Sequence, residues 1–250
     1  MSDPGPLLAL DRVTKRFGDL AAVDDVSFGV VPGTIHALIG PNGAGKTTLI
    51  NLIDGALAAD RGHVHFSGRH ITRLPAHLRA RRGLARTFQI TSIFPGFSLM
   101  EIVQYAVLAA QRRAWQMLRP ARRDRQTRER ADDLLTQTGL AGQGPRPAAA
   151  LSHGQKRQLE IAMALALDPV LLVMDEPMAG MGPEESAELV VLLRCLRQGR
   201  TILLVEHDMQ AVFALADWVT VLVSGKVLAD GRAEQIRADA AVRAAYLGTD

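Results

Sequence analysis

The segment Gly40-Pro-Asn-Gly-Ala-Gly-Lys-Thr47 constrains the fold of this chain more than any other stretch. It matches the pattern G-x-x-x-x-G-K-[ST] at every fixed position. The apolar run before it, residues 34–39, predicts a buried strand, and the apolar spacing over residues 47–54 predicts a helix. This order of elements suits phosphate binding, because the loop amides and the helix N-terminus then face one anion. The segment therefore predicts binding of a nucleoside triphosphate.

Each residue type in this phosphate-binding loop, the P-loop, has a role in triphosphate binding. The glycines let the loop wrap tightly, Lys46 supplies positive charge for the β- and γ-phosphates, and the Thr47 hydroxyl suits Mg²⁺. The alternative is a glycine-rich turn with a chance lysine, which the flanking strand and helix disfavour. The candidate phosphate-binding residues are Gly40, Pro41, Asn42, Gly43, Ala44, Gly45, Lys46, Thr47 and Thr48.

Two adjacent carboxylates, Asp175 and Glu176, follow the apolar run at residues 171–174. A carboxylate at the end of a buried strand is costly unless it has a task such as metal binding. We interpret Asp175 as holding Mg²⁺ through water and Glu176 as the general base that polarises the attacking water. An ordinary acidic turn is the alternative, and the P-loop makes it the weaker one.

Two other polar residues follow predicted strands. His207 lies just beyond residues 201–205 and is a candidate hydrogen-bond donor to a γ-phosphate oxygen, although a lone histidine there is more often a satisfied polar group. Gln89 follows the strand expected at 84–88 and is a candidate contact to Mg²⁺ or to the attacking water. By itself the Gln89 signal is ambiguous.

The segment Leu151-Ser-His-Gly-Gln155 precedes an amphipathic helix. Ser152 and Gln155 fit a capping box, which is by itself a sufficient reason for serine at this place. A Ser–Gly turn at a helix N-terminus is also an anion site, and it need not serve the nucleotide of its own chain. Both interpretations follow from the residues.

The order of elements along the chain predicts an α/β protein. The expected strands cover residues 7–13, 26–30, 34–39, 63–66, 84–88, 170–174, 201–205, 219–223 and 227–229. Solidly apolar strands that alternate with helices indicate a mostly parallel sheet covered on both faces. We therefore predict a single domain over 1–250, with a P-loop NTPase core, an N-terminal antiparallel β portion and an inserted helical lobe at 90–150.

Composition fits a folded protein of this kind, with 48% hydrophobic residues in 250. The single cysteine, Cys195, excludes an internal disulfide, fits a reducing compartment and is expected at a buried helix position. No apolar stretch reaches the roughly 18 residues of a spanning helix, and the N-terminus lacks the pattern of a signal peptide. We expect a soluble protein that is still able to join a membrane complex.

Arginine is concentrated in two clusters. Such clusters are typical of contacts with nucleic acid or an anionic membrane, but no aromatic residues are interleaved for base stacking. A solvated arginine-rich face is therefore the favoured interpretation. The clusters are Arg61, Arg69, Arg73, Arg79, Arg81, Arg82 and Arg86, then Arg112, Arg113, Arg119, Arg122, Arg123, Arg125, Arg128 and Arg130.

The P-loop, Gln89, the segment 151–155, the pair Asp175-Glu176 and His207, in this order, resemble the nucleotide-binding subunit of an ABC transporter. The resemblance covers essentially the whole chain. It implies hydrolysis of MgATP, with Lys46, Gln89, Glu176 and His207 at the catalytic centre and Thr47, Gln89 and Asp175 at Mg²⁺.

The same resemblance implies further contacts and partners. Phe17 would stack on adenine with Val23 beside it, and Ser152, Gly154 and Gln155 would close on the γ-phosphate held by the other subunit of a homodimer or heterodimer. The helical lobe would receive transmembrane permease subunits, with a solute-binding protein acting indirectly and no nucleic acid. The chain would then lie in the cytoplasm, peripheral on the inner face of the cell membrane.

Several short segments resemble branched-chain amino-acid importers in particular, including Gln158–Met163, Glu206–Met209 and Ala245–Gly248. Urea and short-amide importers have close versions of these segments. Two residues depart from the wider family pattern: His153 stands where glycine is usual, and Gly182 stands where many relatives carry aspartate. The remaining alternatives are a non-transport ATPase acting on nucleic acid and a regulatory ATP-binding module without turnover.

Overall fold

The computed structural model describes residues 5–87, 96–111 and 124–247. The chain forms two compact units, the first comprising residues 1–84, 170–177 and 193–250 and the second comprising residues 85–169 and 178–192. The chain passes between them within β6 (Leu84–Arg86), after Pro169, after Pro177 and within α6 (Pro183–Leu196).

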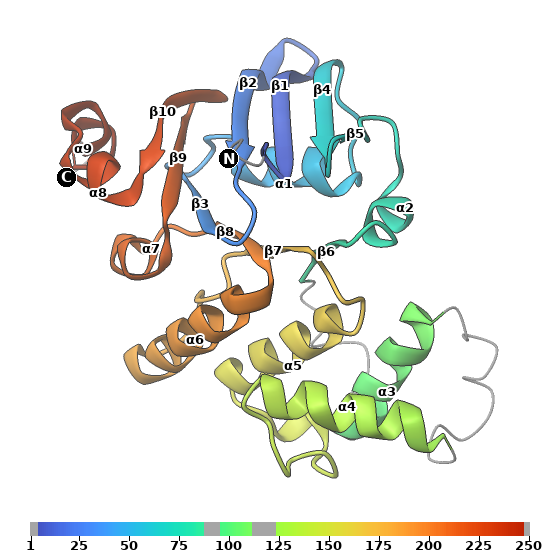
Figure 1. Ribbon diagram of the computed structural model, residues 1–250. Helices are drawn as coiled ribbons and strands as arrows, with labels where there is room; N and C mark the ends of the chain where they lie inside the picture. Colours follow the sequence, from blue (N-terminus) through green and yellow to red (C-terminus); the bar gives the residue numbers. More distant parts are fainter. Residues whose placement is uncertain (1–4, 88–95, 112–123, 248–250) are drawn as a thin grey trace. The chain divides into compact units, whose positions relative to one another are not determined.

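An antiparallel sheet of four strands lies in the first unit (Figure 1). Its order is β2 (Leu20–Val30), β1 (Leu8–Phe17), β4 (Arg61–Phe66) and β5 (Arg69–His70). The predicted antiparallel portion is thus confirmed, because β1 pairs antiparallel with both β2 and β4. Strands β1 and β2 are longer than expected, since irregular register lets their hairpin continue to a two-residue turn at 18–19.

The mostly parallel sheet predicted from the apolar strands is also present. Its order is β10 (Lys226–Arg232), β9 (Trp218–Val223), β3 (Ile35–Ile39), β8 (Thr201–Val205), β7 (Leu171–Asp175) and β6. Strand β3 runs parallel to β8 and β9, and β7 runs parallel to β8, whereas β10 is antiparallel to β9.

Both faces of this sheet are covered, as its central strand shows. Leu38 belongs to a core cluster that includes Leu49 of α1 (Lys46–Asp54). Ala37 and Ile39 point to the opposite face, as neighbours in a strand must, and belong to a second cluster with Val212 of α7 (Met209–Leu215). The other helices of this unit are α2 (Ala76–Ala80), α8 (Ala233–Ala238) and α9 (Ala240–Leu247).

The second unit contains three helices, α3 (Leu99–Ala110), α4 (Arg125–Gln137) and α5 (His153–Leu165), together with the start of α6. The three helices α3, α4 and α5 pack against one another (Figure 1). Each helix begins after a residue whose side chain accepts a backbone N–H, namely Ser98, Asp124 and Ser152. Within the described ranges, no helix is both long and apolar enough to cross a bilayer.

Two expectations about single residues are wrong. Cys195 is exposed, because Leu193 and Leu196 define the buried side of α6 and Cys195 lies on the other side. Arg79, expected on a solvated face, is 1% exposed. Its guanidinium donates to the carbonyls of Leu52, Ile53, Leu74 and Thr72, so burial is possible because backbone oxygens satisfy it.

Candidate nucleotide site

The loop between β3 and α1 presents the amino end of a helix. Gly45 is the N-cap residue of α1 with φ of 99°, and a Cβ there would collide with the Ala22 carbonyl oxygen. Glycine is therefore required both for the backbone conformation and for the close approach. The N-cap residue Gly45 makes no side-chain capping hydrogen bond to this end of α1. Its first N–H groups are the positive end of the helix, which is a site for an anion.

Lys46 is held at this loop with only 7% of its surface exposed. Its Nζ donates to the Gly40 carbonyl oxygen at 2.6 Å and to that of Pro41 at 3.0 Å. Burial lowers the pKa of Lys46, while the charges of Glu176 and Asp175 raise it. The ammonium group is thus pre-positioned beside the helix end and in the field of both carboxylates.

The turn between β9 and β10 supports the loop from outside it. Gly225 donates its N–H to the Ala44 carbonyl oxygen at 3.0 Å, and its own carbonyl accepts from Asp24 N at 2.8 Å. These backbone bonds tie the loop to β2 and to the β9–β10 turn. The Ser224-Gly225 dipeptide predicts a turn from sequence, but not one that lies against the P-loop.

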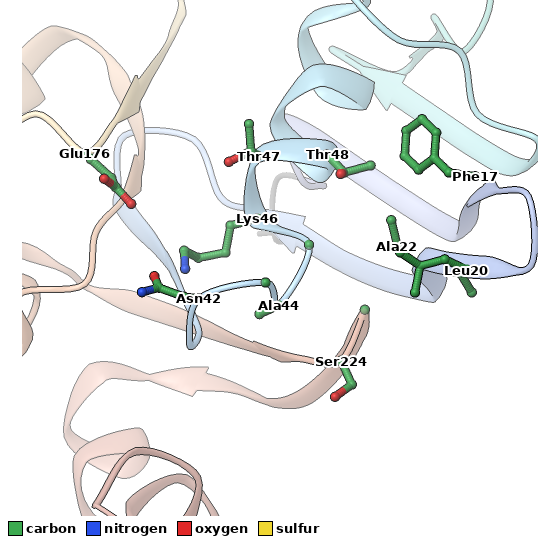
Figure 2. A pocket seen from close by; sticks show the side chains of 14 residues that line it. Phe17, Leu20, Ala22, Asn42, Ala44, Lys46, Thr47, Thr48, Glu176 and Ser224 are labelled. Atoms are coloured by element: carbon green, nitrogen blue, oxygen red, sulfur yellow. The ribbon is translucent and has the colours of Figure 1, made fainter. Parts of the chain in front are cut away.

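A cavity of about 570 Å³ opens over the loop. Figure 2 shows Lys46 and Asn42 on one side of it and Phe17 with Leu20 on the other. Its lining includes every candidate from Asn42 to Thr48, together with Glu176. The complete set of lining residues is Phe17, Leu20, Ala21, Ala22, Asn42, Gly43, Ala44, Gly45, Lys46, Thr47, Thr48, Glu176, Ser224 and Gly225.

Phe17 and Leu20 give this cavity an apolar margin, with 51% and 68% of their surfaces exposed. An exposed aromatic ring beside a phosphate-binding loop is suited to stack on a base. Val23 does not line the cavity, because it is fully buried in the core of the first unit. Ala21 and Ala22 line it instead.

Glu176 lines the cavity and has a left-handed backbone conformation. Its φ is 44°, rare for a residue other than glycine, and its N–H donates to the Val205 carbonyl oxygen at 2.9 Å. Its Oε1 lies 3.8 Å from Nδ1 of His207. The first unit therefore brings Lys46, Glu176 and His207 to one place, with Asp175 at the end of β7 next to Glu176.

These residues fit a nucleoside triphosphate and a hard divalent cation. The helix end and Lys46 supply the positive groups that phosphates need, and Phe17 with Leu20 supplies an apolar surface for a base. The Thr47 hydroxyl and the Asp175 carboxylate are oxygen donors of the kind that Mg²⁺ takes. Gln89, the third candidate for the metal, lies outside the described residues.

The Ser152 turn, residues 152–155, lies in the second unit and forms the predicted capping box. Gln155 N donates to Ser152 Oγ at 3.3 Å, and Ser152 N donates to Gln155 Oε1 at 3.2 Å. The turn also holds a carboxylate: Ser152 Oγ donates to Glu185 Oε1 at 2.8 Å, and Gly154 N donates to the same oxygen at 3.2 Å. The predicted anion-binding groups thus contact an anion that belongs to the chain itself.

This contact changes the acidity of Glu185. The hydrogen bond from the Ser152 hydroxyl, followed by that from the Gly154 amide, lowers the pKa of the Glu185 carboxyl. The Gly182 amide and the charge of His153 act in the same direction. Gly182 and His153, the two departures from the family pattern, are both exposed, and a Cβ at Gly182 would meet no atom within 4 Å.

Comparison with known proteins gives matches along the whole chain. Residues 23–179 match the ABC transporter family, and residues 226–250 match the family described as branched-chain amino acid ATP-binding cassette transporter. The chain is 38% identical to the high-affinity branched-chain amino acid transport ATP-binding protein BraF of Pseudomonas aeruginosa, over 97% of this chain and 98% of that protein. It is also 37% identical to the lipopolysaccharide export system ATP-binding protein LptB of Acidithiobacillus ferridurans, over 97% of both chains.

Solved structures give the same result at the level of the fold. The ADP conformation of an ATP-binding cassette of an ABC transporter aligns with a TM-score of 0.88 at 31% identity, covering 97% of this chain and 98% of that one. A nucleotide-free cassette aligns with a TM-score of 0.86 at 30% identity, covering 96% and 98%.

Proposed function

The chain belongs to the ATP-binding cassette family of ABC transporters, whose members hydrolyse ATP, and on this premise we propose that it powers the import of branched-chain amino acids. The observation that carries the choice of solute is the match of residues 226–250 to the branched-chain family. Overall identity does not distinguish the classes, because the lipopolysaccharide-export relative is 37% identical and BraF is 38% identical.

In this proposal, MgATP binds over the P-loop of the first unit. Phe17 stacks on the adenine, the loop amides and Lys46 hold the phosphates, and Thr47 with Asp175 holds Mg²⁺, joined by Gln89. When bound, the cation would neutralise negative charge on the phosphates. These assignments are supported by the cavity, which is lined by Phe17, the P-loop and Glu176.

Hydrolysis follows from the placement of Glu176. Its carboxylate takes a proton from a water molecule, whose oxygen attacks the γ-phosphorus, and the bond to the ADP oxygen breaks. His207, whose Nδ1 lies 3.8 Å from Glu176 Oε1, donates a hydrogen bond to a γ-phosphate oxygen. The products are ADP and inorganic phosphate.

The second half of each site comes from another subunit. Ser152, Gly154 and Gln155 close on the γ-phosphate held by the partner, so two ATP molecules lie between two subunits of the same or different sequence. Support comes from the Ser152 turn, which already binds a carboxylate through two donors.

The chain acts as one domain with an inserted helical lobe at 90–150, which receives the permease subunits at the inner face of the membrane.

Uptake by cells tests the solute. In a strain that lacks this gene, we expect radiolabelled leucine, isoleucine and valine uptake to be lost, restored by the wild-type gene and not by Glu176→Gln. Urea and acetamide uptake serve as matched comparisons. Loss of urea uptake with intact leucine uptake would contradict the amino-acid assignment, and binding of duplex DNA that weakens steeply with salt would favour the nucleic-acid alternative.

A further inference from the structure

The carboxylate of Glu185 uses the donors that the proposed function assigns to a partner's γ-phosphate. Oε1 accepts from the Ser152 hydroxyl at 2.8 Å and from the Gly154 amide at 3.2 Å. The contact joins the start of α5 to the first turn of α6, and both lie in the second unit. Gly154 permits the approach, because a Cβ there would lie 3.1 Å from the Glu185 carboxyl carbon.

Hydrogen-bond stoichiometry makes the two anions exclusive at Ser152. A serine hydroxyl has one proton to donate, so it cannot donate to Glu185 and to a phosphate oxygen together. The two anions also repel each other at this distance. A γ-phosphate that approaches the Ser152 turn therefore has to remove the Glu185 carboxylate from it.

Hydrogen bonds and a nearby charge favour the contact of Glu185 with the Ser152 turn, but the contact is weak enough for another anion to displace it. Hydrogen bonds from Ser152 and Gly154 and the charge of His153 lower the pKa of Glu185, so the carboxyl group is ionised at neutral pH. A carboxylate in the first turn of α6 is also favoured by the helix dipole. The contact is solvent-accessible, however, and such contacts are individually weak, which lets a triphosphate compete.

We propose that Glu185 is an autoinhibitory competitor for the anion site formed by Ser152 and Gly154, and that ATP held by the partner subunit displaces it when the dimer closes. This inference rests on the proposed function, because it needs a partner's ATP at the Ser152 turn. Glu185 thereby keeps the turn occupied by the chain's own carboxylate while the subunits are apart and raises the ATP concentration at which they close.

Steady-state ATP hydrolysis by the purified transporter complex tests the inference. Glu185→Gln keeps the size of the side chain and removes its charge, and Glu185→Ala removes the acceptor. We expect both variants to lower the KM for ATP by about two- to fivefold, the range for losing one solvent-exposed charged contact, with kcat unchanged or raised. The matched control is Glu184→Gln, which removes the same charge from the same exposed helix turn and should keep the wild-type KM.

The possible outcomes separate this inference from the proposed function. An unchanged KM in both Glu185 variants overturns the inference and leaves the ATPase assignment intact. A lower kcat with a higher KM also overturns it, because Glu185 would then support the Ser152 turn rather than compete for it. If the wild-type complex hydrolyses no ATP, the proposed function fails and the inference fails with it.

Discussion

At the scale of single residues, Glu176 is the side chain on which the proposed chemistry depends most. It lines the cavity over the P-loop and directly follows a buried strand, with a positive φ. Its Oε1 lies 3.8 Å from His207.

Replacing Glu176 with glutamine should separate binding from hydrolysis. Glutamine cannot accept a proton from water, so we expect kcat to fall by about 100-fold or more. ATP binding should persist, because Lys46 and the loop amides remain, and the variant should accumulate as an ATP-bound dimer. Phosphate release and size-exclusion chromatography with ATP measure the two effects.

The control for this variant is Glu234→Gln, which changes an exposed carboxylate on α8 outside the lining of the cavity. It should keep wild-type turnover. Undiminished turnover in Glu176→Gln would contradict the assignment of Glu176 as the general base.

Residues of the candidate site were predictable from the sequence where local spacing determines their position. Lys46 and Thr47 follow from the loop pattern, and Glu176 follows from its place after an apolar strand. Leu20 and Ser224 were not predicted. Leu20 pairs with Phe17 across the turn of a hairpin that extends beyond the expected strands, and Ser224 follows β9, which pairs with the distant strand β3. Val23 was expected beside the base, but the facing of β2 puts its side chain in the core.

At the scale of elements, the short helix α2 carries one buried residue, Arg79. Arg79 donates to the carbonyls of Leu52 and Ile53 at 2.7 Å each, at the C-terminal end of α1. Helix carbonyls at that end lack partners within the helix, so the guanidinium caps α1. The sequence did not predict α2, because five residues are too few to show a helical hydrophobic period. The stability of so short a helix comes from this tertiary contact.

Removing the Arg79 guanidinium should therefore destabilise the first unit. Arg79→Leu leaves four carbonyl oxygens, two in buried and two in partly buried contacts, without this donor, and we expect a loss of at least about 3 kcal/mol in the free energy of unfolding. Arg79→Lys should lose less of the free energy of unfolding, because an ammonium group keeps the charge and some donors. It should still lose some, because lysine lacks the planar fork of donors. Urea denaturation of both variants measures the difference.

Arg82→Leu is the comparison for this experiment, since Arg82 is exposed and its guanidinium makes a long hydrogen bond of 3.3 Å to the Leu78 carbonyl. It should change stability by less than about 0.5 kcal/mol. Equal losses at Arg79 and Arg82 would show that the capping contact contributes nothing.

At the scale of the whole molecule, the chain carries two anion-binding groups that lie in different units. The P-loop belongs to the first unit, and the Ser152 turn belongs to the second. Neither unit contains both the nucleotide cavity and the Ser152 turn. Sequence predicted the order of elements well, because apolar strands and glycine loops are local signals, but it could not predict that Glu185 contacts the Ser152 turn.

Stability of the whole molecule should depend on pH through one buried histidine. His36 is fully buried on β3, and its Nε2 lies 2.7 Å from Thr220 Oγ1. Thr220 donates its proton to Asp230, so His36 Nε2 is the donor to Thr220 and Nδ1 carries no proton. Within the described residues Nδ1 has no hydrogen-bond partner.

Burial lowers the pKa of His36 from 6.5 to about 3. The unfolded chain therefore takes up a proton near pH 6.5 while the folded chain stays neutral, so stability falls as pH falls from about 6.5 toward 3. Between pH 7.5 and pH 5.5 we expect the free energy of unfolding to drop by about 1.4 kcal/mol from this residue. Urea denaturation across this range measures the drop. His36→Gln should abolish it, His77→Gln at an exposed position should retain it, and a wild-type slope in His36→Gln would contradict the assignment.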